Sequence, residues 1–229
     1  GDDDDAADCF RRTFFHELRE QDYQAQRQRA AEAALRPHSA TGGWRIESTA
    51  PSEPGTSRKL SENRVRRILC ERFAALAGRS RFSEAEAKVF SYLREYVDVF
   101  HAACSLPEQE RWERVVLLHA LNHVVRTEQI VSRNNARIKA AQGSEPPDVA
   151  DGSLTRARVL LVAPARHTAF RCVQTLLGLH GAKTAAMKSF RGRFAEEFGP
   201  DDEEAVPTRV SGAPMPDDYV ATFKGNTDD

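Results

Sequence analysis

The stretch that most limits the fold is RVLLVAPARHTAF, residues 158–170. Its apolar run over 159–163 is too short for a helix core and has no polar face, which predicts a strand covered on both sides, as in a parallel sheet. Pro164 cannot donate to a sheet ladder, so the strand ends there. Apolar residues then recur at helical spacing through Leu177. The pattern predicts a strand, a tight turn and a helix, the front half of a βαβ unit.

Two polar residues come directly after this predicted strand. In open α/β sheets, ligands collect at the carboxyl ends of the strands. Arg166 and Thr168 would then stand where a phosphate or a nucleic-acid backbone could be met. The alternative is a solvated arginine and a threonine that caps the helix, and the residues by themselves leave both readings open.

Composition sets outer limits. The chain has 229 residues, 40% of them hydrophobic, which is enough for one medium domain plus extensions. The net charge of −1 is unevenly spread, with five aspartates in residues 2–8 and a basic stretch over 58–81, and this asymmetry suggests several partners. Four cysteines without paired spacing argue against a disulfide framework and favour a reducing compartment. No apolar run approaches a membrane span in length, so no membrane attachment is expected. The opening without methionine suggests a piece of a longer protein.

Residues 1–60 are predicted to form an acidic extension. The opening GDDDDAAD is low in complexity and is expected to be disordered without a partner. A helical pattern begins at Asp8, but beyond Gln21 it has no apolar face. Its apolar residues lack a continuation that could form a core, so we expect them to dock on a partner. These residues are Phe10, Phe14, Phe15 and Leu18. Residues 37–58 read as a linker with a short extended piece at 43–49.

Three helices are expected over residues 61–141. Ser61 caps the first, Ser83 and Glu86 form a capping box at the start of the second, and the third runs from near Ser105 to about 141. The apolar stripe of the first helix is Val65, Ile68, Leu69, Phe73 and Leu76. Short helices are also predicted at 186–199 and 217–225.

Arginines are concentrated between residues 58 and 81, where only two glutamates oppose them. Arginines beside an apolar stripe suit phosphate contact, because each neutralised phosphate releases counterions. A solvated helix face, or a face that binds acidic protein, is the alternative. With Arg166 and a smaller patch near residue 191 included, the candidate RNA-binding residues are Arg64, Arg66, Arg67, Arg72, Arg166, Arg191 and Arg193.

Two motifs resemble functional sites but lack required residues. GLHGAKT, residues 178–184, has Ala182 where a phosphate-binding loop needs glycine before the lysine, and it follows a helix instead of a strand. HALNH places His119 and His123 at i, i+4, but it lacks the glutamate of the metalloprotease pattern and an evident third ligand. We therefore expect no nucleotide site, no metal, no cofactor and no catalytic residue.

Five stretches, taken together and in order, resemble one family. They are FSYLREYVDVF (90–100), LLHALNHVVRTEQIVSRNNARI (117–138), LTRARVLLVAPARHTAFRCVQTLL (154–177), RFAEEFG (193–199) and PDDYVATFKGNTDD (216–229). The chain resembles the U3 small nucleolar RNA-associated protein 25 family, also called digestive organ expansion factor homologues. The resemblance covers about residues 83–229 well and 8–52 only loosely.

This resemblance implies a degenerate superfamily-2 RNA helicase. Pro164, Arg166 and Ala169 match the helicase motif PTRELA, which grips the nucleic-acid backbone, whereas Ala165 and His167 depart from it, as does Thr168. The stretch PEQERWERVV stands where a helicase carries its phosphate-binding loop, and it has neither glycine nor GK[ST]. The family is held to lack ATPase activity and to work in the small-subunit processome of the nucleolus.

The resulting prediction is a helix-rich α/β chain, with N-terminal helical extensions that lead into an incomplete RecA-like domain. Residues 1–60 would be the extension, 61–141 a helical region and 142–229 the truncated start of that domain. The function implied is a non-catalytic ribosome biogenesis factor that binds precursor ribosomal RNA, the U3 small nucleolar ribonucleoprotein and other processome proteins within a large ribonucleoprotein complex. The alternatives are an ATP-dependent RNA helicase and a pure protein-binding adaptor without RNA contact.

Overall fold

The structure, a computed structural model, describes residues 8–14, 19–34, 36–38, 46–48, 53–101, 105, 108–141, 149, 151, 156–181, 192–195 and 197–198. Several predictions lie outside these residues. They concern the acidic run before Asp8, Phe15, Leu18, Arg191, much of the linker and the helix at 217–225. The chain forms two units, an N-terminal unit of residues 1–64 and 81–100 and a C-terminal unit of residues 65–80 and 101–229.

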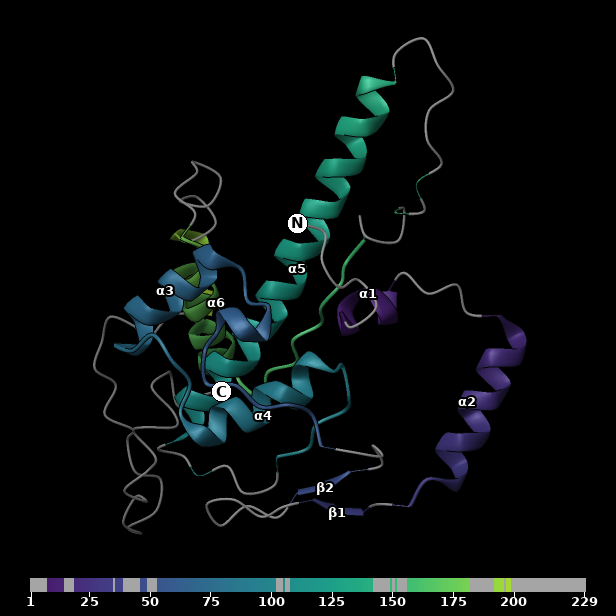
Figure 1. Cartoon of the computed structure of the whole chain (residues 1–229). Coiled ribbons are helices and arrows are strands. Elements are labelled where there is room, and N and C mark those ends of the chain that lie inside the picture. Colours follow the sequence, from purple (N-terminus) through teal and green to yellow (C-terminus); the bar gives the residue numbers. More distant parts are fainter. Residues whose placement is uncertain are drawn as a thin grey trace. The chain divides into compact units, whose positions relative to one another are not determined.

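The N-terminal unit is built from short elements (Figure 1). They are α1 (Cys9–Phe14), α2 (Glu20–Glu32), β1 (Arg36–His38), β2 (Ile46–Ser48), the 3-10 helix η1 (Ser61–Asn63) and α4 (Glu84–Arg94). The strands β1 and β2 pair antiparallel, so the predicted extended piece at 43–49 is confirmed over Ile46–Ser48. Helix α2 has no buried residue, as the missing apolar face predicts.

The apolar side chains of α1 are partly buried within the N-terminal unit. Phe10 is 1% exposed, and its ring centre lies 6.3 Å from that of Tyr96. Phe14, 41% exposed, meets Tyr96 edge-on at 5.0 Å. Phe10 is thus already buried within the described residues of this unit, and docking of α1 on a partner protein stays a prediction that rests on the more exposed Phe14. The sequence around α1 could not predict the contact between Phe10 and Tyr96, because the two residues lie 86 positions apart in the chain.

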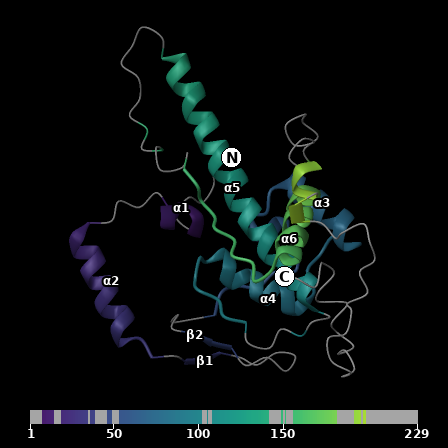
Figure 2. The same ribbon diagram turned by 180° about the vertical axis from the view of Figure 1, so that it is seen from behind.

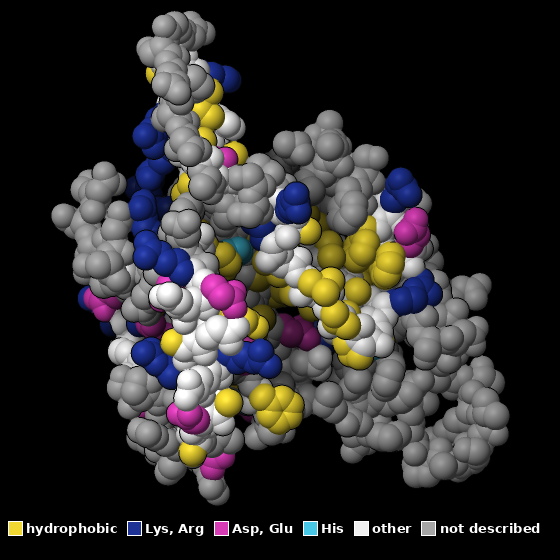
Figure 3. All heavy atoms as spheres, turned by 90° about the vertical axis from the view of Figure 1, so that its right-hand side faces the viewer, with side chains coloured by type: hydrophobic (Ala, Val, Ile, Leu, Met, Phe, Trp, Pro, Cys, Tyr) yellow, Lys and Arg dark blue, Asp and Glu magenta, His cyan; other side chains and the backbone are white. Residues whose placement is uncertain are grey.

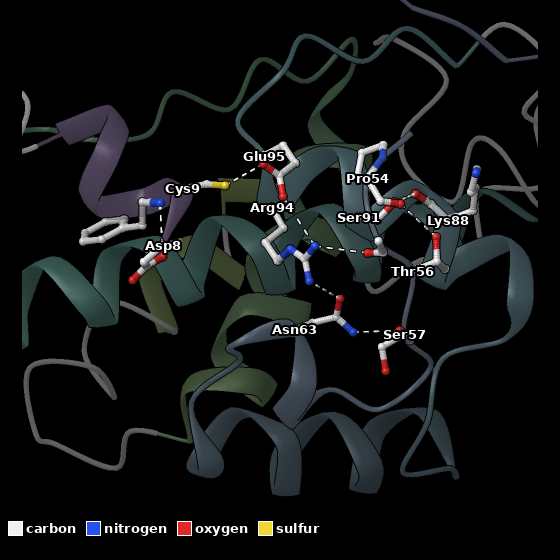
Figure 4. Close-up of polar contacts among 12 residues, drawn as sticks. Asp8, Cys9, Pro54, Thr56, Ser57, Asn63, Lys88, Ser91, Arg94 and Glu95 are labelled. Carbon is white, nitrogen blue, oxygen red and sulfur yellow. Dashed lines mark hydrogen bonds and ion pairs between the residues drawn. The ribbon is translucent and has the colours of Figure 1, made fainter. Parts of the chain in front are cut away.

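Helix α4 begins as the sequence predicts. The backbone N–H of Ser83 donates to the Glu86 carboxylate at 2.8 Å, and the N–H of Glu86 donates to Ser83 Oγ at 3.3 Å, so both halves of the capping box are present. Phe90 packs its ring 4.9 Å from Phe82 in the core of the unit. Figure 4 shows the polar contacts that join the end of α4 to the preceding loop. Arg94 donates to the Gly55 carbonyl at 3.1 Å and to the Asn63 side chain at 3.4 Å.

The predicted first helix does not start at Ser61. Residues Ser61–Asn63 form only the 3-10 turn η1, and Arg64 then takes a left-handed conformation with φ of 56°. A left-handed residue cannot continue a right-handed helix, so the regular helix α3 (Arg67–Ala77) begins after it. The predicted stripe is correct at Val65, Leu69 and Phe73, which are buried, whereas Ile68 and Leu76 are among the exposed hydrophobic residues.

The described residues of the C-terminal unit include the helices α3, α5 (Gln109–Ala140) and α6 (Arg166–His180), and residues 192–195 and 197–198, within the helix predicted at 186–199, are also helical. Helix α6 packs against both α3 and α5 (Figures 1 and 2). Long apolar side chains of α3, α5 and α6 fill the space between them, namely Leu69, Phe73, Trp112, Val115, Leu118, Leu121, Leu177 and Leu179. The Asn122 side chain on α5 accepts a hydrogen bond from the Arg66 N–H at 3.0 Å, which satisfies a backbone donor at the start of α3.

The predicted strand at 159–163 is absent from the described part of the chain. These residues are neither helix nor strand, and Leu160 and Val162 are 85% and 86% exposed. A strand requires a neighbour that pairs with its backbone, and the described residues of the C-terminal unit offer none. The helix that follows is present, however, as α6 begins at Arg166 directly after the turn at Pro164. The helix-rich character is thus confirmed, whereas the parallel sheet is not seen among these residues.

Candidate nucleic-acid interface

The turn before α6 holds Arg166 in a defined place. Ala165 is extended, with φ of −148° and ψ of 160°, and Arg166 is the first helical residue. The Arg166 guanidinium donates to the backbone carbonyl of Glu197 and lies 5.9 Å from the centre of the Phe198 ring. Neither the carbonyl nor the ring carries a negative charge. Arg166 is thus oriented by these two partners without being neutralised by them, and it is exposed.

The segment that contacts Arg166 is held on α6 by aromatic stacking. The Phe194 ring stacks on Phe170 at 5.8 Å and on Phe198 at 4.6 Å. Arg193, by contrast, is 79% exposed in its side chain and lies 3.8 Å from the Glu197 carboxylate. Stacking within the chain uses the Phe194 ring, so a base could not stack on that ring without displacing Phe170 or Phe198.

Thr168 does not take either role expected of it. It is buried, and its hydroxyl lies 3.3 Å from His167 Nε2. The N-cap of α6 is Ala165, and no side chain caps it. Thr168 is therefore neither the cap of the helix nor an exposed phosphate contact.

The arginines of the basic stretch are divided between the two units. Arg64 belongs to the N-terminal unit and pairs with buried Asp8 at 3.5 Å, whereas Arg66, Arg67 and Arg72 belong to the C-terminal unit. Arg66 is half-buried before α3. Arg67 is exposed and lies 3.6 Å from Glu71. Arg72 is exposed too, and it is five residues, or about 140°, round α3 from Arg67. RNA contact at these positions stays a prediction.

The glycine motif GLHGAKT begins inside a helix. Gly178, Leu179 and His180 form the last turn of α6, and Gly181 ends it with φ of 67°. The Gly181 N–H donates to the Leu177 carbonyl at 2.9 Å. Backbone donors used in a helix end are not available to wrap a phosphate, so the described half of the motif cannot act as a phosphate-binding loop.

The two histidines of α5 lie in an electropositive, buried setting. Burial lowers the pKa of His119 to about 4, and the nearby His123 and Arg126 act in the same direction. Burial also lowers the pKa of His123, with Arg158 and Arg126 adding to the effect. Among the described residues, no three His, Cys, Asp or Glu side chains group as a metal site requires. Within the same residues, no helix is both long enough and apolar enough to span a membrane.

Sequence analysis missed a row of arginines on α5. Arg126, Arg133 and Arg137 recur at i, i+7 and i+11, which is one face of a helix. The spacing could have revealed them, because the helix was predicted over this whole range. They were passed over because the basic stretch at 58–81 is denser in charge.

Comparison with known proteins identifies relatives over most of the chain. Residues 96–229 match the family model described as UTP25, NTP hydrolase-like domain. U3 small nucleolar RNA-associated protein 25 homolog of Xenopus tropicalis is 35% identical over 161 residues, which cover 69% of this chain and 20% of that protein. The Homo sapiens homolog is 33% identical over 155 residues, covering 66% of this chain and 20% of that protein.

A fungal protein is similar to this chain over a comparable length. U3 small nucleolar RNA-associated protein 25 of Yarrowia lipolytica is 30% identical over 176 residues, covering 75% of this chain and 25% of that protein. The chain thus spans between about a fifth and a quarter of the length of these relatives. No solved structure matches it. The chain belongs to the U3 small nucleolar RNA-associated protein 25 family, and its residues 96–229 belong to the NTP hydrolase-like domain of that family.

Proposed function

We propose that this chain is part of a non-catalytic assembly factor of the small-subunit processome in the nucleolus. The factor would support precursor rRNA processing toward the small-subunit rRNA by binding that RNA, the U3 small nucleolar ribonucleoprotein and other processome proteins. The observation that carries the proposal is the family match over residues 96–229, together with relatives named for association with U3 small nucleolar RNA.

The geometry at the end of α6 supports the non-catalytic part of the proposal. Hydrolysis of a nucleoside triphosphate needs a loop whose free N–H groups surround the phosphates. In GLHGAKT the first three residues are helical and the Gly181 N–H is bonded to Leu177. Burial raises the pKa of the Cys172 thiol, which lowers the fraction of reactive thiolate at that position.

The exposed run at 159–163 supports a RecA-like architecture. Five apolar residues, four of them exposed, followed by a proline turn and helix α6, are the pattern expected of the front half of a βαβ unit. We propose that pairing with strands from outside the described residues completes that sheet. The domain boundaries at 60 and 141 are part of the same proposal.

Within this function, Arg166 is the proposed RNA contact of the turn, because its side chain is exposed and is held in place at the start of α6. Arg67, Arg72 and Arg193 are exposed and remain in the proposal with it, as do Arg64 and Arg66, each with part of its surface in contact with the chain. Phe14 remains the proposed docking residue of α1 because it is 41% exposed.

The test is affinity purification of tagged full-length protein from growing cells. We expect U3 RNA and processome proteins to co-purify, and depletion of the protein to lower the yield of small-subunit rRNA relative to large-subunit rRNA. Absence of U3 RNA from the purified material, with the protein intact, would contradict the proposal.

The rival function is an ATP-driven RNA helicase, and the name of the matched domain, NTP hydrolase-like, favours it over other enzymes. An ATPase assay on the full-length protein, with and without RNA, separates the two. We expect no turnover above background. Turnover that disappears in Lys183→Ala would establish the rival.

A further inference from the structure

The distal part of α5 buries no residue against the part of the chain that the structure describes. The buried residues of α5 are Trp112, Val115, Leu117, Leu118, Leu121, Asn122, His123 and Thr127. None lies beyond position 127, although the helix continues to Ala140. Figures 1 and 2 show this part of α5 extending past α3 and α6, the helices of the same unit. A helical segment without tertiary packing has little stability of its own, so its exposed polar face is a candidate for contact with a partner.

Three arginines line one face of this segment. At 100° per residue, Arg133 and Arg137 lie within about 20° of Arg126 around the helix. The row extends for about 16 Å along the axis, a length over which one strand of a nucleic-acid duplex carries about five phosphates. Figure 3 shows Lys and Arg side chains gathered along one edge of the projecting part of the molecule.

The charge of the row is not cancelled within the helix. Residues 126–140 contain four cations (Arg126, Arg133, Arg137 and Lys139) and one carboxylate (Glu128), which gives a net charge of +3 (four minus one). Glu128 lies about 160° round the helix from the row. No ion pair of Arg133 or Arg137 occurs with any residue that the structure describes.

The neighbouring flank of α5 is already occupied by the returning chain. Asn134, about 80° from Arg126, donates to the Asp151 carboxylate at 2.8 Å. Arg158 donates to the Val124 carbonyl at 3.1 Å and to the Thr127 hydroxyl. Ile138, about 120° from Arg126 around the helix, is 39% exposed, and the arginine row lies to one side of it.

We propose that the face of α5 carrying Arg126, Arg133 and Arg137 is a phosphate-binding surface for RNA. The inference rests on the proposed processome function, which supplies RNA as the partner, and it names the part of the chain that touches the backbone. A row of guanidinium groups on a helical segment without an aromatic residue suits a repeating line of phosphates better than a protein interface, whose centre is depleted of charge and rich in aromatic residues. The contact would carry no sequence preference, because phosphates are the same at every position.

The test compares full-length variants that lose equal charge. Arg133→Gln plus Arg137→Gln removes two charges from the row and leaves half-buried Arg126 in place. Arg27→Gln plus Arg29→Gln removes two charges from α2, which is also an exposed helix without buried residues. Arg133→Lys plus Arg137→Lys keeps the charge. Binding of a labelled single-stranded RNA of mixed sequence, about 20 nucleotides long, is measured by fluorescence anisotropy across a salt series.

The α5 glutamine variant should bind about tenfold more weakly near physiological salt and lose about 1.5 from the slope of log affinity against log salt. The lysine variant and the α2 variant should keep the wild-type slope. Equal losses in the α5 and α2 glutamine variants, or no loss in either, would overturn the inference. Unchanged RNA binding with loss of a processome protein would also overturn it, since the surface would then bind acidic protein. If U3 RNA still co-purifies while the slope is unchanged, only this inference fails and the proposed function stands.

Discussion

Arg171 on α6 is joined to Glu113 on α5 by two parallel hydrogen bonds, from Nε at 2.9 Å and from Nη2 at 2.7 Å. Both side chains are largely shielded, with 23% and 17% of their surfaces exposed. The bonds to Glu113 raise the pKa of Arg171, so its guanidinium group stays charged. This paired contact joins α6 to α5 five residues after Arg166, the first residue of α6.

The first prediction concerns this ion pair. Arg171→Ala should lower the free energy of unfolding by roughly 2 kcal/mol, because it leaves a shielded carboxylate without its partner. Arg171→Lys should recover only part of the loss, since an ammonium group cannot make the paired contact. Arg67→Ala is the matched control, because its contact with Glu71 is exposed and worth less than about 0.5 kcal/mol. Urea unfolding measures all three, and equal effects of Arg171→Ala and Arg67→Ala would refute the prediction.

The second prediction concerns pH. The pKa of His119 is lowered to about 4 by burial, below its ordinary 6.5, so the unfolded chain binds a proton more readily than the folded one between these values. Stability from this group is therefore complete above pH 6.5 and is lost as the pH falls toward 4, by up to about 3 kcal/mol.

His119→Gln removes this titration and should flatten the stability profile between pH 4 and 6.5, as measured by thermal unfolding at a series of pH values. His180→Gln, at an exposed position near the end of α6, is the control and should leave the wild-type slope. A slope in His119→Gln identical to wild type would show that His119 is not the group responsible.

The third prediction concerns Gly181, which ends α6 in a left-handed conformation with φ of 67°. A Cβ there would lie 2.7 Å from the Arg72 guanidinium carbon, whereas a Cβ on Gly78, with φ of 65°, would meet nothing within 4 Å. Both alanine variants should lose about 1 kcal/mol from backbone strain. Gly181→Ala should lose slightly more, and Arg72→Ala should remove that excess in a double-mutant cycle. No coupling between positions 72 and 181 would count against the observed contact.

The fourth prediction tests whether the exposed run at 159–163 is a buried strand in the full-length protein. Leu160→Asp plus Val162→Asp should change the stability of the 229-residue chain by less than about 0.5 kcal/mol, because both side chains are exposed. In the full-length protein the same change should abolish cooperative folding of the domain if a sheet covers the run. Tyr23→Asp, on exposed α2, serves as control in both proteins. A full-length protein that tolerates the double change would exclude a buried strand at 159–163.

The sequence by itself determined the elements whose causes are local. The start of α4 follows from Ser83 and Glu86, three residues apart, and the extent of α5 follows from apolar periodicity and the glycine- and proline-rich stretch after it. The start of α6 follows from Pro164, which cannot continue a strand. Family membership was also readable, because an ordered set of short motifs survives where no single one is decisive.

Only the tertiary structure decided what depends on residues far apart in the chain. The break at Arg64 and the later start of α3 are coupled to a salt bridge with Asp8 and to Asn122, which bonds the Arg66 N–H from a helix 56 residues away. Phe10 is buried because Tyr96 reaches it, and Arg166 is oriented by Glu197 and Phe198. The run at 159–163 is the opposite case, because its strand pattern is local but no partner strand is present among the described residues. A helix satisfies its hydrogen bonds within its own segment, but a strand is completed only by another strand, so its pattern predicts a tendency that pairing must fulfil.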